Sequence, residues 1–140
     1  MLSRLFPPDI KERAWIMEPG CKEEVQVPVF ERAYDLFGDG SIVLVELPGH
    51  AAGQMGALVQ TPQGPVLLAA DAAWHRDNFR KMQAPSPLVK VFIHSWPDLI
   101  ASLEKLHAFY TGNPDTPIIP THCGDSIADY LSQQEKQAGI

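Results

Sequence analysis

The stretch "FGDGSIVLVELPGHAAGQMGALVQTPQGPVLLAAD", residues 37–71, decides the fold. It opens on a Gly-Asp-Gly turn signal and then contains three apolar runs of strand length, SIVLVEL, GALVQT and PVLLAAD. The second and third runs flank Pro-Gln-Gly, whose residues suit a tight turn. Residues 56–71 are therefore predicted to form two antiparallel strands, and the stretch as a whole predicts a largely antiparallel sheet.

The flanking segments add helices and shorter strands. "PVFERAYDLF", residues 28–37, reads as a short helix or an irregular crossing, and "VKVFIH", residues 89–94, as a further strand. A capping pattern at Ser95, followed by apolar residues at helical spacing, predicts a helix that lies on the sheet. "TPIIPTH", residues 116–122, is a short buried strand, and an amphipathic helix is expected behind Ser126. The class is α+β.

Composition and charge narrow the class of protein. With 140 residues, 45% of them hydrophobic, residues 1–140 are expected to form one domain. A net charge of −6, without a basic cluster, argues against a nucleic-acid partner. No apolar run is long enough to span a membrane, and Pro7 and Pro8 interrupt the N-terminal segment where a signal peptide would be apolar. Cys21 and Cys123 are expected to be reduced thiols, which predicts a cytoplasmic protein.

Three polar residues occupy the same position, just past the C-terminal end of an apolar strand. They are His50 after IVLVELPG, Asp71 after VLLAA and His122 after PIIPT. Imidazole nitrogens and carboxylate oxygens are ligands that zinc accepts, and one carboxylate can bridge two metals. Taken singly, each residue also has a simpler interpretation, because a turn histidine is often solvated and Asp71 could cap a helix. The chemistry alone leaves both readings open.

The residues of these motifs and their order along the chain favour the metal site. Residues 37–74, followed after an intervening helix by "IIPTHCGD", resemble the metallo-β-lactamase fold superfamily, and more narrowly its metal-dependent, lactonase-like hydrolases, which include acyl-homoserine lactonases. The resemblance runs from about residue 28 to 125. It implies that His50, Asp71 and His122 are metal ligands, that Asp71 bridges two divalent metal ions, and that zinc is the first expectation for both.

The resemblance also implies a fold and a reaction. The family fold is a four-layered α/β/β/α sandwich of two similar halves with the metals at the seam, and this chain matches the second half. The implied activity is hydrolysis of a small-molecule lactone or ester by a metal-bound hydroxide. Asp71 would act as a catalytic residue that passes a proton to the leaving group.

Two features depart from the family pattern. The 140 residues contain no His-x-His-x-Asp-His motif, which supplies four ligands in the family. Each metal would then have two protein ligands from this chain, so weak or no metal binding by the chain alone is expected. In lactonases a tyrosine commonly follows the aspartate by three positions and polarises the substrate carbonyl. Trp74 stands there instead, as a candidate substrate-binding residue with a different reach.

A non-catalytic function therefore stays open beside the hydrolase. The chain could be a truncated or degenerate half-domain that acts as a fragment or an association module. Alternate residues of the strands are apolar on the side that a second sheet would cover, so self-association through an exposed sheet face is expected. A thioesterase of the glyoxalase type is a weaker enzyme alternative, because "DAAW" resembles the lactonase pattern more closely.

The other candidate side chains have structural interpretations. His75 is expected in a loop or at a helix start, where it could line the same pocket, and His94 at the end of a strand, donating to nearby backbone. His107 is expected on the flank of a helix. Cys123 could offer a thiolate to a soft metal, but a small buried thiol is the commoner outcome.

Overall fold

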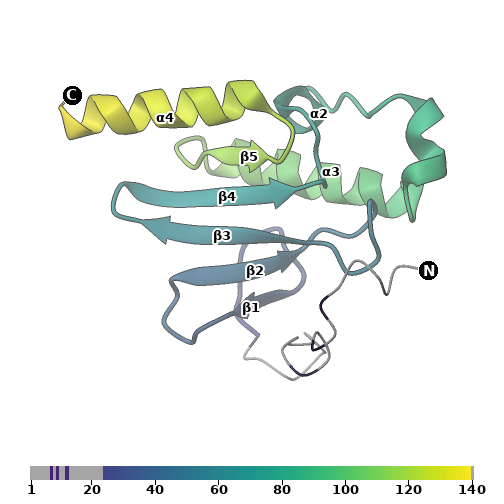
Figure 1. Cartoon of the computed structure of the whole chain (residues 1–140), viewed down its shortest axis with the longest axis horizontal. Coiled ribbons are helices and arrows are strands. Elements are labelled where there is room, and N and C mark those ends of the chain that lie inside the picture. The colour runs from purple at the N-terminus through teal and green to yellow at the C-terminus, as the bar shows by residue number, and fades with distance from the viewer. Residues whose placement is uncertain (1–6, 8, 10–11, 13–23, 140) are drawn as a thin grey trace.

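A single mixed sheet forms the centre of the protein, which a computed structural model describes at residues 7, 9, 12 and 24–139. The sheet order is β1-β2-β3-β4-β5. Strands β1 to β4 pair antiparallel with their neighbours, and β5 pairs parallel with β4. The predicted α+β class with a largely antiparallel sheet is confirmed (Figure 1). The strands are β1 (Ala33–Asp35), β2 (Ile42–Glu46), β3 (Met55–Thr61), β4 (Gly64–Ala70) and β5 (Ile118–Pro120).

The helices follow β4 and make the crossover that a parallel β4–β5 pair requires. The chain passes through α2 (Arg76–Arg80), the 3₁₀ helix η2 (Pro87–Phe92) and α3 (Trp96–Gly112) before it re-enters the sheet as β5. After β5, α4 (Gly124–Ala138) runs along the β5 edge of the sheet (Figure 1). Ser95 caps α3 as predicted, because its hydroxyl accepts a hydrogen bond from the Asp98 amide.

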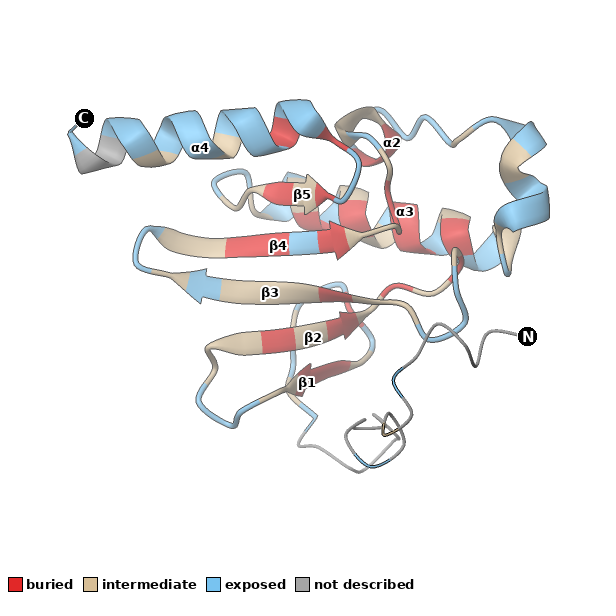
Figure 2. Ribbon diagram, viewed as in Figure 1, coloured by how far each residue is buried: buried red, intermediate tan, exposed pale blue. Residues whose placement is uncertain are grey.

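The hydrophobic core lies between one face of the sheet and α3. Strand pairing places Val43 opposite Leu58 and Leu58 opposite Leu67, so these side chains share the face that α3 covers. Burial is densest along this layer (Figure 2). The fully buried members include Val45, Leu47, Leu67, Leu103 and Leu106.

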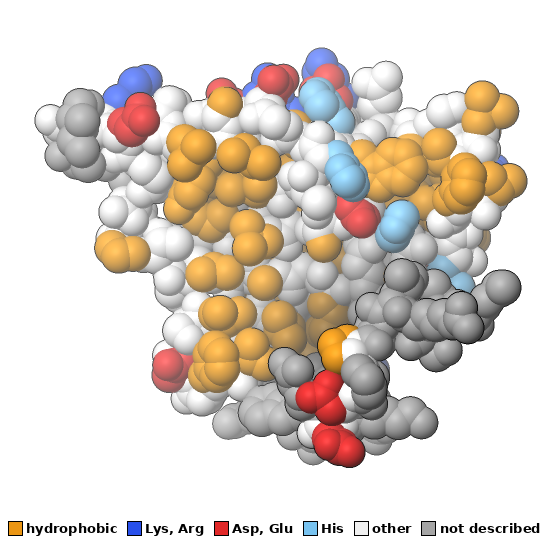
Figure 3. Space-filling model, in the orientation of Figure 1, with side chains coloured by type: hydrophobic (Ala, Val, Ile, Leu, Met, Phe, Trp, Pro, Cys, Tyr) orange, Lys and Arg blue, Asp and Glu red, His pale blue; other side chains and the backbone are white. Residues whose placement is uncertain are grey.

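The opposite face of the sheet is also apolar but stays open within the described part of the chain. Leu44, Ala57 and Leu68 pair in register across β2, β3 and β4 on this face, and Leu68 remains 43% exposed. With Ile119 and Ile127, they line a shallow hollow of about 380 Å³. Figure 3 shows the hydrophobic side chains gathered over the strands. We call this the open sheet face. The alternation predicted from the sequence therefore produces an exposed apolar surface here.

Three sequence predictions are wrong in detail. The segment 28–37 contains β1, a strand that extends the sheet by pairing with β2, rather than a helix or an irregular crossing. The segment 89–94 overlaps η2 and is not a strand, because Ser86 caps a 3₁₀ helix that starts at Pro87. The last helix has Cys123 rather than Ser126 at its N-cap position, without a capping side-chain hydrogen bond, since the chain turns into α4 directly after β5.

Two further expectations from the sequence concern membrane spans and the state of the cysteines. No helix among the described residues is long and apolar enough to cross a membrane. Cys123 is a buried free thiol, and Cys21 lies outside the described residues.

Candidate metal centre

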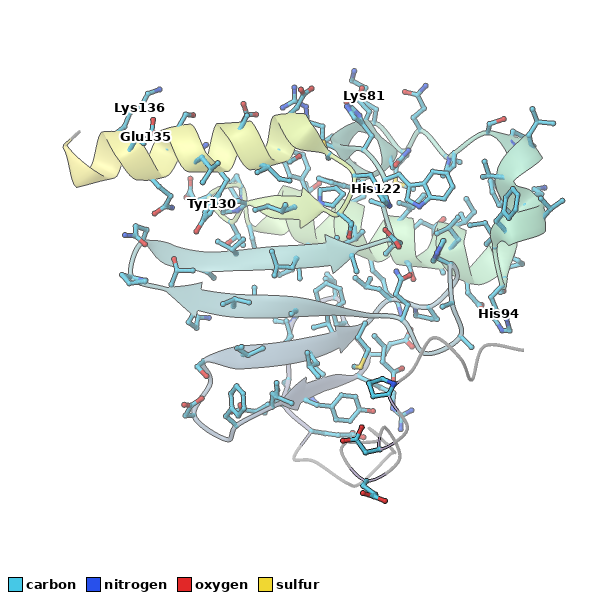
Figure 4. The ribbon with its side chains drawn as sticks, viewed as in Figure 1. Lys81, His94, His122, Tyr130, Glu135 and Lys136 are labelled. Carbon is cyan, nitrogen blue, oxygen red and sulfur yellow. The ribbon has the colours of Figure 1, made fainter. Side chains whose placement is uncertain are left out.

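The topology brings the three residues to one end of the sheet, the end at which β2, β4 and β5 terminate. Strands β2 and β4 both run antiparallel to β3, and β5 runs parallel to β4, so all three have their C-terminal ends at the same edge. His50 follows β2 through a turn, Asp71 follows β4 directly, and His122 follows β5 by two residues. Figure 4 shows His122 beside the end of β4, under the loop that leads to α2.

Asp71 lies between the two histidines and presents a different oxygen to each. His50 Nε2 is 3.7 Å from Asp71 Oδ2, and His122 Nε2 is 3.2 Å from Asp71 Oδ1. The side chains of His50 and Asp71 are both 31% exposed, and that of His122 is 64% exposed. The three residues therefore form two donor pairs that share one carboxylate.

The spacing and the unsatisfied atoms of this cluster fit metal ions. Two ligand atoms, each at about 2.1 Å from a tetrahedral zinc ion, lie about 3.4 Å apart, which falls between the two observed nitrogen–oxygen distances. Asp71 Oδ1 is buried without a hydrogen-bond partner, and the His122 contact with Oδ1 lacks hydrogen-bond alignment. His50 Nδ1 is also buried without a partner, but it is the ring nitrogen opposite the one that faces Asp71. Buried polar atoms usually have a partner, so the unpartnered carboxylate oxygen of Asp71 is the atom that fits a bound cation.

The cluster is incomplete as a metal site within the described residues. No three His, Cys, Asp or Glu side chains in this part of the chain are arranged to hold one metal ion. Each nitrogen–oxygen pair would thus supply two ligands, whereas a structural zinc site has four protein ligands and a catalytic site has three.

Backbone geometry fixes the turn that carries His50. Gly49 has a φ of +135°, a conformation that favours glycine. A methyl group at Gly49 would overlap the backbone of Leu99 in the first turns of α3, and it would come within 2.8 Å of the Leu99 Cβ. The Pro-Gly-His turn can therefore approach α3 this closely only because residue 49 has no side chain.

Hydrogen bonds from the start of α3 hold the same turn. The Ser95 and His94 amides donate to the carbonyls of Gly49 and His50 at 2.9 and 3.2 Å. The buried Ser102 hydroxyl donates to the Pro48 carbonyl at 2.6 Å. Ser102 was not identified from the sequence, although a single polar residue on the otherwise apolar face of a helix could have signalled a buried hydrogen bond.

A local distortion of β4 determines where Asp71 lies. The pairing of β4 with β5 shifts register between Leu68 and Ala70, and Ala70 has a φ of +48°. The Thr121 amide donates to the Ala70 carbonyl at 3.2 Å, which ties the start of the His122 turn to the residue before Asp71. Such strained positions often occur at functional sites. Asp71 does not cap α2, since His75 does so.

Trp74 lies beside the cluster. Its ring meets the His50 ring edge-on, with 6.2 Å between ring centroids. The buried Asn78 side chain accepts hydrogen bonds from the Trp74 and His75 amides at 2.9 and 2.8 Å, and it donates to the Gln83 carbonyl at 2.7 Å. Asn78 thus shapes the loop after Asp71, a role that the sequence did not suggest.

The remaining histidines have structural positions. His75 is exposed and caps α2, accepting from the Asp77 amide at 3.2 Å. The His107 ring lies 2.7 Å from the Phe79 carbonyl, which links α3 to α2. His94 is exposed near the start of α3, apart from His122 (Figure 4).

Cys123 follows His122 but is directed into the protein, where it is 1% exposed. Burial raises the pKa of its thiol, but hydrogen bonds from Ser126 and from the Arg76 and Ser126 backbone outweigh burial and leave the pKa below its ordinary value. The Ser126 hydroxyl lies 3.1 Å from the sulfur. Cys123 therefore occupies the position expected of a small buried thiol.

Sequence comparisons find lactonases and lactamases. No family model matches the chain. It is 30% identical over 119 residues to the N-acyl homoserine lactonase AttM of Rhizobium radiobacter, a match that covers 84% of this chain and 43% of the lactonase. It is also 38% identical over 87 residues to a gamma-lactamase of Gibberella moniliformis, covering 47% of this chain and 36% of that protein. The chain spans less than half the length of these relatives.

Structural comparison gives the same fold. An N-acyl homoserine lactone hydrolase, solved with N-hexanoyl-L-homoserine at its catalytic metal centre, superimposes with a TM-score of 0.56 and 20% identity. The match covers 69% of this chain and 36% of that protein. The resemblance to lactonase-like proteins of the metallo-β-lactamase fold is confirmed, and the partial coverage agrees with a match to one part of that fold.

Proposed function

We propose that this chain carries one part of the active site of a lactonase-like hydrolase of the metallo-β-lactamase fold, with His50, Asp71 and His122 as its metal ligands. The observation that supports this most directly is the shared carboxylate, whose two oxygens face two different imidazoles. The substrate would be a small lactone or ester, by analogy with the N-acyl homoserine lactonase AttM.

Each side chain has a distinct role in this proposal. His50 Nε2 and Asp71 Oδ2 would hold one divalent ion, and His122 Nε2 and Asp71 Oδ1 the other, with zinc as the first candidate. When bound, such ions lower the pKa of a water molecule and polarise a carbonyl. Asp71 would keep the two ions together and accept or donate a proton. Trp74, beside His50, would contact the substrate through its ring and its indole N–H.

Zinc binding by the chain tests the ligand assignment. Asp71→Asn should reduce affinity more than His50→Gln or His122→Gln, because only Asp71 belongs to both donor pairs. His94→Gln is the matched control, since His94 is exposed and lies apart from His122. The measurement is isothermal titration of zinc into the chain mixed with the segment of the Rhizobium radiobacter lactonase that it does not match, because weak or no binding is expected of the chain alone. Equal affinity for the parent chain and Asp71→Asn would contradict the bridging role.

Activity requires more metal ligands than the described part of this chain brings together. The chain should be mixed with the segment of the Rhizobium radiobacter lactonase that it does not match, and hydrolysis of an N-acyl homoserine lactone measured. Turnover that depends on both components and is lost in Asp71→Asn would support the hydrolase. If the mixture forms a stable zinc-loaded complex that hydrolyses neither lactones nor esters, the non-catalytic half-domain is the better description.

A further inference from the structure

His122 is the least enclosed of the three candidate ligands. Its side chain is 64% exposed, and its ring lies 3.2 Å from Asp71 Oδ1 without hydrogen-bond alignment. No other side chain among the described residues is recorded as a hydrogen-bond or ion-pair partner of the ring. The position of His122 beside Asp71 therefore depends on the backbone that carries it, which is the turn between β5 and α4.

Helix α4 has little buried surface of its own to hold this turn. Of its side chains that the structure describes, only that of Ser126 is buried, and Figure 2 shows the helix as largely exposed. Its large aliphatic residues Ile127 and Leu131 are 41% and 54% exposed. Cys123 stands at the N-cap without a capping side-chain hydrogen bond. Apolar burial and capping therefore do little to fix the start of α4.

An arginine at the start of α2 makes the link that α4 otherwise lacks. Arg76 Nη1 lies 2.6 Å from Asp129 Oδ2, and Nη2 lies 3.1 Å from Asp125 Oδ2. The two aspartates are four residues apart and share one side of α4. An isolated exposed ion pair contributes little, but Arg76 is only 25% exposed and its planar guanidinium donates to two carboxylates at once. We call these three residues the Arg76 clamp.

Two further contacts connect the same turn to the strand that precedes the shared carboxylate. The Thr121 amide donates to the Ala70 carbonyl at 3.2 Å, and the Arg76 backbone hydrogen-bonds to the Cys123 thiol. Thr121 and Cys123 are the residues on either side of His122. The Arg76 clamp therefore acts on a turn whose backbone is already joined to the end of β4.

The His50 side of the candidate centre has a different support. Its turn is held by α3, because the Ser95 amide donates to the Gly49 carbonyl at 2.9 Å and the Ser102 hydroxyl donates to the Pro48 carbonyl at 2.6 Å. These contacts involve neither α2 nor α4. The two donor pairs that share one carboxylate are thus supported by separate parts of the fold.

Resting on the proposed function, we propose that Arg76 is a positioning residue for the His122 side of the metal centre. It holds the first turns of α4, and through them the His122 ring, beside Asp71 Oδ1. Without the clamp, the start of α4 and His122 would move together, while His50 would keep its place. Loss of Arg76 should therefore affect one donor pair and spare the other.

Amide hydrogen exchange of the full 140-residue chain tests the clamp without metal. In Arg76→Gln, the Thr121 amide should exchange about 2- to 30-fold faster, the range typical of coupling through such networks, while the Ser95 amide should be unchanged. Arg76→Lys keeps the charge but not the planar fork, so its effect should be smaller than that of Arg76→Gln. Lys81→Gln is the matched control, because its ion pair with Asp77 also starts from α2 but does not reach α4.

Two exchange results would overturn the proposal. An unchanged Thr121 amide in Arg76→Gln would show that the clamp does not hold the turn, and equal acceleration at Thr121 and Ser95 would show that Arg76 acts only on global stability. Asp129→Asn should reproduce the effect in part. Adding Arg76→Gln to Asp129→Asn should then have a smaller effect than in the parent, because both changes remove the same contact, and full additivity would count against the clamp.

Zinc binding separates the clamp from the ligand assignment. The chain is mixed with the segment of the Rhizobium radiobacter lactonase that it does not match, and the ring signals of His50 and His122 are followed by NMR as zinc is added. In Arg76→Gln, the His122 signals should need about 2- to 30-fold more zinc to respond, while the His50 signals follow the parent. Equal weakening at both rings would overturn the proposal. If neither ring responds in the parent, the ligand assignment fails, and the amide exchange still decides whether Arg76 holds the His122 turn.

Discussion

Replacing Gly49 with alanine should be among the most damaging small changes in this protein. Gly49 has a φ of +135°, and a Cβ there would overlap the backbone of Leu99. Holding alanine in this conformation costs about 1–3 kcal/mol, and forcing an extra carbon against packed backbone costs about 1–3 kcal/mol more. The sum, about 2–6 kcal/mol, is a large fraction of the stability of a typical domain.

Two other glycines separate these contributions. Gly64 has a φ of +115°, but a methyl group there would have no other atom within 4 Å, so Gly64→Ala should cost only the conformational part, about 1–3 kcal/mol. Gly53 has neither a positive φ nor a close neighbour, so Gly53→Ala should change stability by less than about 1 kcal/mol. Gly53→Ala is therefore expected to be the most stable of the three variants, Gly64→Ala the next and Gly49→Ala the least stable.

Urea unfolding followed by tryptophan fluorescence measures these differences as shifts in midpoint. Zinc affinity is a second readout, because a displaced turn moves His50 while the Gly64 hairpin lies at the other end of β4. The reasoning would be refuted if Gly49→Ala were no less stable than Gly64→Ala, since the overlap with α3 would then cost nothing.

Three other changes test a hydrogen bond behind the His50 turn, an ion pair on α2 and the open sheet face. Ser102→Ala should lower the free energy of unfolding by about 1–3 kcal/mol because it leaves a turn carbonyl without its donor, whereas the exposed control Ser132→Ala should have little effect in the same urea assay. A hydrogen bond from Lys81 holds the pKa of Asp77 below 3.8, so this carboxylate stabilises the fold above that pH and the contribution is lost as the pH falls through the lowered pKa. Asp77→Asn should therefore be less stable than the parent at neutral pH and converge with it in acid, and a constant gap in pH-dependent unfolding would contradict this. Leu68→Ser should reduce both self-association and binding of a hydrophobic dye, and a parent chain that is monomeric at high concentration and binds no dye would count against an exposed apolar face.

Local patterns explain why much of the fold could be predicted. Turn residues and alternating apolar residues identified the β3–β4 hairpin, and the capping pattern at Ser95 identified α3, because each signal depends on residues close together in the sequence. The same signals failed where local preference was weak. The segment 89–94 has the composition of a strand but follows Ser86 and Pro87, which start a 3₁₀ helix. Val91 and Phe92 in this segment are 80% and 76% exposed, which composition alone did not suggest.

For the candidate site, the sequence by itself determined that His50, Asp71 and His122 each follow a strand, since strand and turn patterns are local. Only the tertiary structure decided that β2, β4 and β5 run in the same direction and end on the same side of the sheet. It also decided that Asp71 turns one oxygen towards each histidine. The supports of that arrangement are contacts between residues far apart in the chain, such as Ser102 with Pro48. No local pattern encodes such contacts, because they exist only once the crossover through α3 has packed the helix against the sheet.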